Sequence, residues 1–185
     1  MKIDYKKIVI SIIAILVCLI MLIYITKQVN NNHIIHWKDY LKVTNTYVHN
    51  KNTFTQGIFF YNNKMYETGG LYGKSCIYKD IDLKTGIANK TYKFDNSVFA
   101  EGSVIFNDKL YVLTYKENKA FIFNKETLEL EKEYSYKREG WGLTTDGENL
   151  IASDGTSNLF FLDKDLELVK TVNVKINRKR SKKHK

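Results

Sequence analysis

The sequence predicts an all-β protein built from repeated four-stranded units. Three glycine-centred strings open these units: Gln56-Gly57, Glu101-Gly102 and Glu139-Gly140-Trp141-Gly142. Each string is followed by short apolar runs with Asn- or Asp-containing turns between them. Self-similarity at roughly 40–45 residues, with about four strands per unit, is typical of β-propeller blades. The 13 Tyr and 10 Phe residues, with no Pro, also favour strands.

The first unit extends from about Phe54 to Phe94. One of its turns has a clear physical basis, because Asp82 can bond its own backbone and Gly86 adopts positive φ readily. The segment 68–70, Thr-Gly-Gly, is predicted as a tight loop. The predicted strands are Ile58–Tyr61, Met65–Glu67, Ser75–Ile81 and Ala88–Phe94.

The second and third units repeat this order. The second has predicted strands at Ser103–Phe106, Leu110–Tyr115, Ala120–Phe123 and Glu129–Tyr136. The third has predicted strands at Gly142–Thr145, Asn149–Ser153, Asn158–Leu162 and Leu168–Val174. Val43–His49 also alternates apolar and polar residues, as a strand that completes the last blade of a propeller would. The β-propeller domain is therefore expected over residues 41–174, with about three of five blades.

The N-terminal part predicts a membrane anchor. Residues 8–25 are apolar apart from Ser11, close to the roughly 20 residues that span hydrocarbon as a helix. No small-x-small cleavage site follows, so an uncleaved transmembrane signal-anchor is favoured over a cleaved signal. A buried soluble helix is disfavoured because the segment has no polar face. Residues 1–7 form a basic flank that should stay in the cytoplasm, which places the domain outside a single-pass cell membrane protein.

Residues 26–40 form a polar linker, and 175–185 a basic tail. His33 and His36 of the linker have helical metal-ligand spacing but no third ligand nearby, so a solvated linker is favoured. The formal charge of +9 lies largely in the tail and the N-terminal flank, which leaves the domain near neutral and argues against a nucleic-acid partner. Cys18 and Cys76 are not expected to form a disulfide, and Cys76 is interpreted as a buried small hydrophobe.

Several motifs together resemble the plant-type glutaminyl-peptide cyclotransferases, also called glutamine cyclotransferases. They are Phe54-Thr55-Gln56-Gly57, Glu67–Ser75, Phe99-Ala100-Glu101-Gly102, Asn107–Tyr111, Leu113–Glu117, Glu139–Thr144 and Ser153–Ser157. The resemblance covers about residues 54–174, in the order of the family. It implies a five-bladed propeller, no metal and no cofactor. It also implies an enzyme that converts the N-terminal Gln of peptides or proteins to pyroglutamate and releases ammonia.

The resemblance assigns a catalytic carboxyl group and a substrate pocket. Glu101 is the candidate proton shuttle, and burial near the propeller axis would raise its pKa; the alternative is an exposed turn carboxylate. Tyr115 lies where the family carries Trp. The expected substrate-binding residues are Phe54, Gln56, Phe99, Tyr115 and Trp141, each of which could instead be ordinary core. Glu67 and Glu139 are weaker candidates, expected to be partners of turn amides.

By the same resemblance, the family continues for about two more blades, which carry an Asn, a Trp and a Lys of the site. The basic tail 175–185 has no likeness to that continuation. Back-translated with A/T-rich codons and shifted by one base, it does resemble the continuation, so one hypothesis is a frameshift near Ile176. A solvated tail and a lipid or nucleic-acid anchor are the alternatives. We therefore expect impaired activity, with a peptide-binding propeller fragment or a degenerate inactive product as alternatives.

Overall fold

The computed structural model describes residues 20–21 and 41–175. Outside these residues lie two of the expected segments, the flank 1–7 and the linker 26–40. Nearly all of the expected anchor 8–25 and tail 175–185 also lies outside them. Ile20 and Met21 are helical. In the part that is described, no helix is long and apolar enough to cross a membrane.

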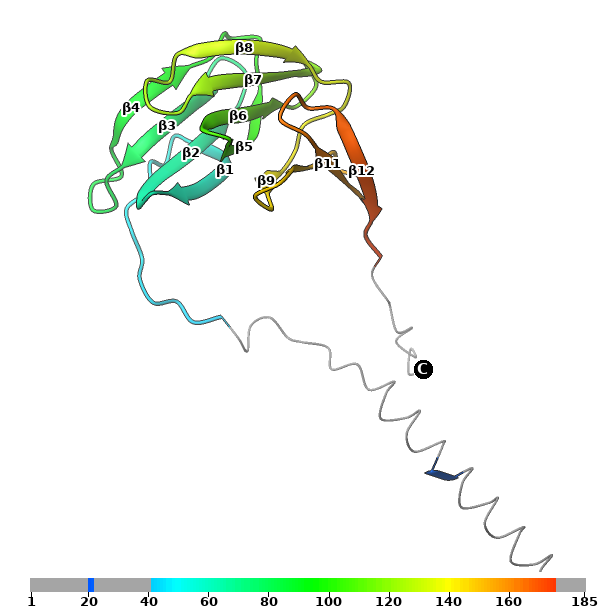
Figure 1. The fold of residues 1–185 in the computed structure, drawn as a ribbon. Coiled ribbons are helices and arrows are strands. Elements are labelled where there is room, and N and C mark those ends of the chain that lie inside the picture. Colours follow the sequence, from blue (N-terminus) through cyan, green and yellow to red (C-terminus); the bar gives the residue numbers. More distant parts are fainter. Residues whose placement is uncertain (1–19, 22–40, 176–185) are drawn as a thin grey trace, which may run out of the picture. The chain divides into compact units, whose positions relative to one another are not determined.

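The described residues form an all-β fold of three four-stranded antiparallel sheets, each with its strands in chain order (Figure 1). The first sheet contains β1 (Phe54–Tyr61), β2 (Lys64–Gly70), β3 (Cys76–Ile81) and β4 (Ala88–Lys93). The second contains β5 (Ala100–Phe106), β6 (Lys109–Thr114), β7 (Lys119–Asn124) and β8 (Leu130–Ser135). The third contains β9 (Leu143–Thr145), β10 (Leu150–Ser153), β11 (Asn158–Leu162) and β12 (Leu168–Asn173).

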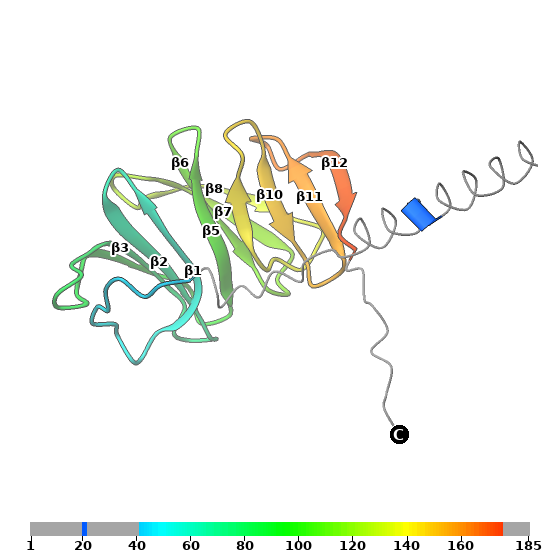
Figure 2. The same ribbon diagram turned by 90° about the horizontal axis from the view of Figure 1, so that it is seen from below.

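The second sheet lies between the other two, as blades lie in a propeller (Figure 2). Alternation along β6 explains how it covers both neighbours, since successive side chains of a strand point to opposite faces. Leu110 and Val112 belong to the core shared with the first sheet. Tyr111 and Leu113 belong to the core shared with the third. The all-β, repeated-sheet prediction is therefore confirmed.

The outer faces of the first and third sheets carry exposed apolar side chains. Ile58 and Phe60 of β1 are 53% and 61% exposed, whereas Phe59 between them packs toward the second sheet. On β12, Leu168 and Val172 are also exposed. These faces are apolar surfaces of the kind that normally pack against another sheet.

Two sequence expectations about local structure are wrong. Thr68-Gly69-Gly70 is the end of β2 and not a loop. The reason is close packing: a Cβ at Gly69 would lie 2.7 Å from Thr53 Cγ2, and one at Gly70 would lie 2.4 Å from Phe99 Cε1. The Thr68 hydroxyl donates to Ser103 Oγ of the second sheet at 2.5 Å.

Val43–His49 forms no strand, although its alternation predicted one. Its last residues lie against the first sheet by other contacts. The Val48 carbonyl oxygen lies 3.1 Å from where a Cβ of Gly86 would be, and His49 bonds the Glu67 side chain at 2.8 Å. The close approach of the Val48 backbone and the side-chain bond of His49 thus replace the backbone ladder that a strand would need.

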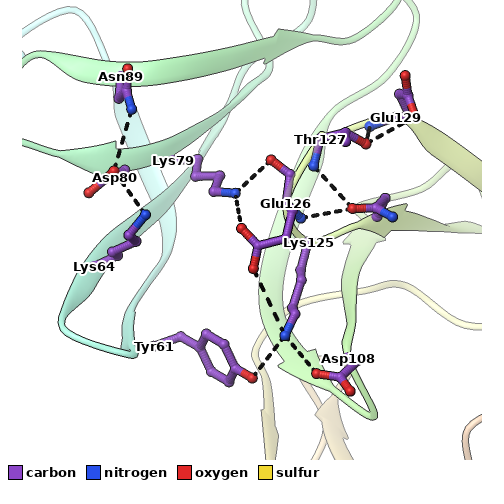
Figure 3. A network of polar contacts seen from close by, with 11 residues as sticks. Tyr61, Lys64, Lys79, Asp80, Asn89, Asp108, Lys125, Glu126, Thr127 and Glu129 are labelled. Atoms are coloured by element: carbon purple, nitrogen blue, oxygen red, sulfur yellow. Dashed lines mark hydrogen bonds and ion pairs between the residues drawn. The ribbon is translucent and has the colours of Figure 1, made fainter.

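A polar network joins β1 and β3 of the first sheet to two turns of the second sheet (Figure 3). Lys79 of β3 is only 5% exposed, and its Nζ donates to the Glu126 carbonyl oxygen at 2.6 Å and to Glu126 Oε2 at 2.9 Å. Lys125 Nζ donates to Asp108 Oδ1 at 2.6 Å and to the Tyr61 hydroxyl at 3.3 Å. Hydrogen bonds to Asp108 and Tyr61 raise the pKa of Lys125. The network fixes β1 and β3 to the turns of the second sheet.

Candidate active site

The candidate site begins at two β-bulges at matching places in the repeat. The pairing of β5 with β6 shifts between Ala100 and Ser103, and that of β1 with β2 shifts between Thr55 and Gly57. Glu101 lies inside the first bulge. A bulge leaves a residue unpaired in the ladder and re-aims its side chain. The repeat therefore frees the residue just before each glycine from its regular strand direction.

The glycines themselves bring neighbouring inner strands together. A Cβ at Gly57 would lie 2.9 Å from the Ser103 nitrogen, and one at Gly102 would lie 2.4 Å from the Trp141 carbonyl oxygen. The Gly102 N–H donates to that same oxygen at 2.8 Å. Only glycine allows such close approach of backbones. The three residues that precede Gly57, Gly102 and Gly142 thus lie at corresponding positions on adjacent sheets: Gln56, Glu101 and Trp141.

Glu101 is a partly buried carboxyl group whose proton affinity is increased. Desolvation by burial is the main cause, and the nearby charge of Glu117 adds to it, which raises the pKa of Glu101 from 4.5 to about 7. A carboxyl group with this pKa exchanges protons readily near neutral pH. The expected burial of Glu101 and its raised pKa are therefore found in the structure.

Aromatic rings form a wall centred on Phe99. The Phe99 ring centroid lies 6.4 Å from that of Phe54, 5.4 Å from that of Tyr72 and 5.6 Å from that of Tyr115. Gly70 packs beneath the wall, since its Cβ would lie 2.4 Å from Phe99 Cε1 and 2.9 Å from Gln56 Cγ. The structure thus brings four of the five expected substrate-binding residues together.

Trp141, the fifth, is held from the third sheet. Its side chain is 44% exposed, and its Nε1 donates to Glu139 Oε2 at 3.2 Å. Gly155 lies against the indole, because a Cβ there would be 2.6 Å from Trp141 Cζ2. The hydrogen bond from the Gly102 N–H to the Trp141 carbonyl oxygen places the Trp141 backbone next to the bulge that contains Glu101.

Glu67 and Glu139 are not partners of turn amides, contrary to expectation. Glu139 accepts from the Trp141 indole, as described above. Glu67 is 2% exposed and accepts from His49 Nε2 at 2.8 Å and from Thr55 Oγ1 at 2.5 Å. It alternates with Thr68, so it points to the opposite face of the first sheet from Ser103. There it lines a cavity of about 400 Å³ with Tyr78 and other residues.

Two residues of the site carried no predicted role. The Tyr72 hydroxyl donates to Glu117 Oε1 at 2.8 Å, and this bond crosses from the first sheet to the second. Both residues lie within motifs that resemble the family, Glu67–Ser75 and Leu113–Glu117. Their contact could not be seen in the sequence, because it joins positions 45 residues apart on different sheets.

The described residues contain no group of three His, Cys, Asp or Glu side chains that could hold a metal ion. Cys76 is buried, as expected of a small hydrophobe. What the site offers chemically is the Glu101 carboxyl group with a pKa of about 7, the Glu117 carboxylate that bonds Tyr72 and Phe99, and the aromatic wall around Phe99.

Comparisons with known proteins relate this geometry to a family. The family model described as glutamine cyclotransferase matches residues 15–184. The glutaminyl-peptide cyclotransferase of Arabidopsis thaliana is 36% identical over 125 residues, which is 66% of this chain and 39% of that protein. The chain thus spans about two fifths of the length of this curated relative.

Solved structures agree on the fold. The crystal structure of Myxococcus xanthus glutaminyl cyclase matches with a TM-score of 0.66 at 30% identity, over 72% of this chain and 56% of that one. The Neurospora crassa Pan2 WD40 domain matches with a TM-score of 0.52 at 12% identity, over 64% of this chain and 36% of that one, which concerns the fold alone. With a family model that covers most of its sequence, the chain belongs to the glutamine cyclotransferase family.

Proposed function

We propose that the chain is a glutaminyl-peptide cyclotransferase that acts on peptides or proteins with an N-terminal Gln. The observation that carries this proposal is Glu101, a half-buried carboxyl group with a pKa of about 7, two residues after Phe99 at the centre of the aromatic wall. Family membership gives the reaction class: the N-terminal Gln cyclises to pyroglutamate and ammonia leaves.

The reaction needs few groups because nucleophile and electrophile belong to one residue. The neutral α-amine nitrogen attacks the side-chain amide carbon, and a new C–N bond closes the ring. Glu101 takes one proton from the amine nitrogen and returns a proton to the amide nitrogen. The old C–N bond then breaks, and ammonia leaves with both electrons of that bond. Glu101 ends in its starting state, and no other reactant is consumed.

The remaining site residues hold the substrate. Phe54, Phe99, Tyr115 and Trp141 would enclose the apolar stem of the Gln side chain, and Gln56 would bond its amide. The contact of Gly70 with both Phe99 and Gln56 supports a shared pocket. No residue of the described part is assigned as the donor for the developing oxyanion, so we expect slow turnover by the chain alone.

We propose further that the three sheets correspond to three of five propeller blades. The 56% coverage of the Myxococcus xanthus structure supports this correspondence. The apolar outer faces of β1 and β12 are the surfaces at which further blades would pack.

We also propose that residues 8–25 anchor the chain in the cell membrane, with the β domain outside. The length of the apolar run and its flank of Lys6 and Lys7 support this. Protease added to intact cells should then digest the β domain. Protection of the domain until the cells are lysed would contradict the orientation.

The function is tested by incubating the purified full chain with a peptide that begins with Gln. We expect the product to be lighter by one ammonia, with free ammonia in solution. The matched variant is Glu101→Gln, which should slow turnover about 10²–10⁴-fold. The competing candidate is a peptide-binding module without catalysis, favoured only by the exposed faces of the outer sheets. Binding of the peptide without any ammonia release by the wild type would support that alternative.

A further inference from the structure

Glu117 is a second carboxylate of the candidate site, and its surroundings are unusual. It follows β6 by three residues, and Oε1 accepts from the Tyr72 hydroxyl at 2.8 Å. Oε2 accepts from the Phe99 backbone N–H at 3.4 Å. The hydrogen bond to Glu117 also raises the pKa of Tyr72. Two neutral donors on two different sheets therefore fix the orientation of this carboxylate.

Glu117 has acceptor capacity to spare and, among the described residues, no cationic partner. A carboxylate can accept about four hydrogen bonds, and two are described. Within residues 41–175, the ion pairs at 4.0 Å or less do not include Glu117. Glu117 bonds the backbone of Phe99, two residues before Glu101, and its charge adds to the raised pKa of Glu101. The site therefore has an excess of negative charge, which a positively charged ligand would neutralise.

The same carboxylate lies at the aromatic wall. The Phe99 ring contacts those of Tyr72 and Tyr115, and Glu117 bonds the Tyr72 hydroxyl and the Phe99 backbone N–H directly. Aromatic faces attract ammonium groups through the ring quadrupole. Lys116 Nζ, 4.6 Å from the Tyr115 ring centroid, shows that this ring accepts an ammonium group. The hydrogen bond to Tyr115, and then the charge of Glu139, raise the pKa of Lys116, and the ion pairs among residues 41–175 do not join Lys116 to Glu117.

We propose that Glu117 binds the α-ammonium group of the incoming peptide and thereby places that nitrogen beside Glu101. This inference rests on the proposed function, since it supplies the group that the reaction must deprotonate. The ionised Glu101 carboxylate takes the extra proton of the bound ammonium and passes it to solvent, which frees the nitrogen lone pair and leaves Glu101 ionised for the cyclisation step. Glu117 is thus the recognition group for a free N-terminus, and Tyr72 is the residue that positions it.

The test measures peptide binding to the full chain by titration calorimetry. Three probes separate charge from side chain: Gln-Ala-amide, Ala-Ala-amide and N-acetyl-Gln-Ala-amide. The first two carry an α-ammonium group, whereas the acetylated probe does not. The variant is Glu117→Gln, and Glu148→Gln, an exposed residue of the β9–β10 turn, is the control with the same change of charge. Thermal melting confirms that each variant is folded.

We expect Glu117→Gln to weaken binding of both amine-bearing probes about tenfold or more, since a charge-assisted bond is lost. Binding of the acetylated probe should be unchanged, and Glu148→Gln should match the wild type. Tyr72→Phe keeps the Glu117 carboxylate but removes the hydrogen bond that orients it, so we expect a smaller loss of affinity for the amine-bearing probes. This variant serves as the second test if Glu117→Gln does not fold.

Equal affinity of wild type and Glu117→Gln for the amine-bearing probes would overturn the inference. So would an equal loss of affinity for the acetylated probe. Failure of both amine-bearing probes to bind the wild type would also overturn it. The proposed function fails separately. If Gln-Ala-amide binds through Glu117 but releases no ammonia, the recognition site stands and the cyclase proposal falls. If ammonia is released and Glu117→Gln binds normally, the reverse holds.

Discussion

The Gly102 N–H donates a 2.8 Å hydrogen bond to the carbonyl oxygen of Trp141, and the two backbones touch where any side chain would intrude. Glu101 precedes Gly102 in a bulge of the second sheet, and Trp141 lies at the start of the third. This one contact therefore both packs two sheets together and sets two candidate site residues side by side. Fold and site depend on the same glycine.

Replacing Gly102 by Ala should therefore destabilise the chain. The new Cβ would lie 2.4 Å from the Trp141 carbonyl oxygen and 2.5 Å from the Leu143 nitrogen, and backbone atoms cannot rotate away. We expect a loss of about 1–3 kcal/mol in the free energy of unfolding, measured in urea. Gly142→Ala is the control, because its Cβ would meet only Ser153 Oγ at 3.1 Å. Equal losses for the two variants would contradict the proposed close approach.

Gly70→Ala should disturb the aromatic wall around Phe99 more than it disturbs the fold. The added methyl group collides with the Phe99 ring and with the Gln56 side chain, both of which can move. We expect kcat/KM for a Gln peptide to fall about tenfold to a hundredfold, since small misplacements of binding groups are costly. Activity equal to that of the wild type would show that these two side chains do not position the substrate.

Comparing Lys79→Met with Lys64→Met tests whether a buried contact of the polar network stabilises the chain more than an exposed one (Figure 3). Methionine keeps most of the volume but leaves the Glu126 carbonyl oxygen without its donor, so we expect a loss of about 1–3 kcal/mol in stability. Lys64→Met removes an exposed ion pair with Asp80 at 3.3 Å and should cost less than about 1 kcal/mol. A Lys79→Met variant as stable as Lys64→Met would contradict this ranking.

Glu101 should make stability depend on pH. Its pKa is raised from 4.5 to about 7 on folding, so the folded chain binds more protons than the unfolded chain between these values. The contribution of Glu101 is fully present below about pH 4.5 and is lost as the pH rises through about 7. We expect the stability of the wild type relative to Glu101→Gln to fall between about pH 5 and about pH 8. A pH-independent difference would show that the pKa is not raised.

The strands were predictable because the same order of apolar runs and turns occurs in all three units. The twelve strands expected in the three units are all found in the described residues, within a few residues of their predicted ends. Thr68-Gly69-Gly70 was predicted wrongly because glycine usually marks a loop, whereas here it allows Phe99 to pack against a strand. Val43–His49 alternates like a strand, but its last residues make side-chain contacts instead.

The site was predictable only in part, for a related reason. Motif resemblance identified Glu101 and the aromatic wall, since these residues lie within recognisable strings. The Tyr72–Glu117 bond and the buried Glu67–His49 pair join residues that are distant in sequence. Periodicity assigns a residue to a face of a sheet, but it does not say which side chain of another sheet it meets.

The most direct measurement is the pH dependence of pyroglutamate formation from Gln-Ala-amide by the full chain and by Glu101→Gln. We expect the wild-type rate to follow an ionisation with an apparent pKa near 7. The variant should be about 10²–10⁴-fold slower at every pH, as the loss of a general acid–base group predicts. A variant as fast as the wild type, with the same pH profile, would contradict a role for Glu101 as the proton shuttle.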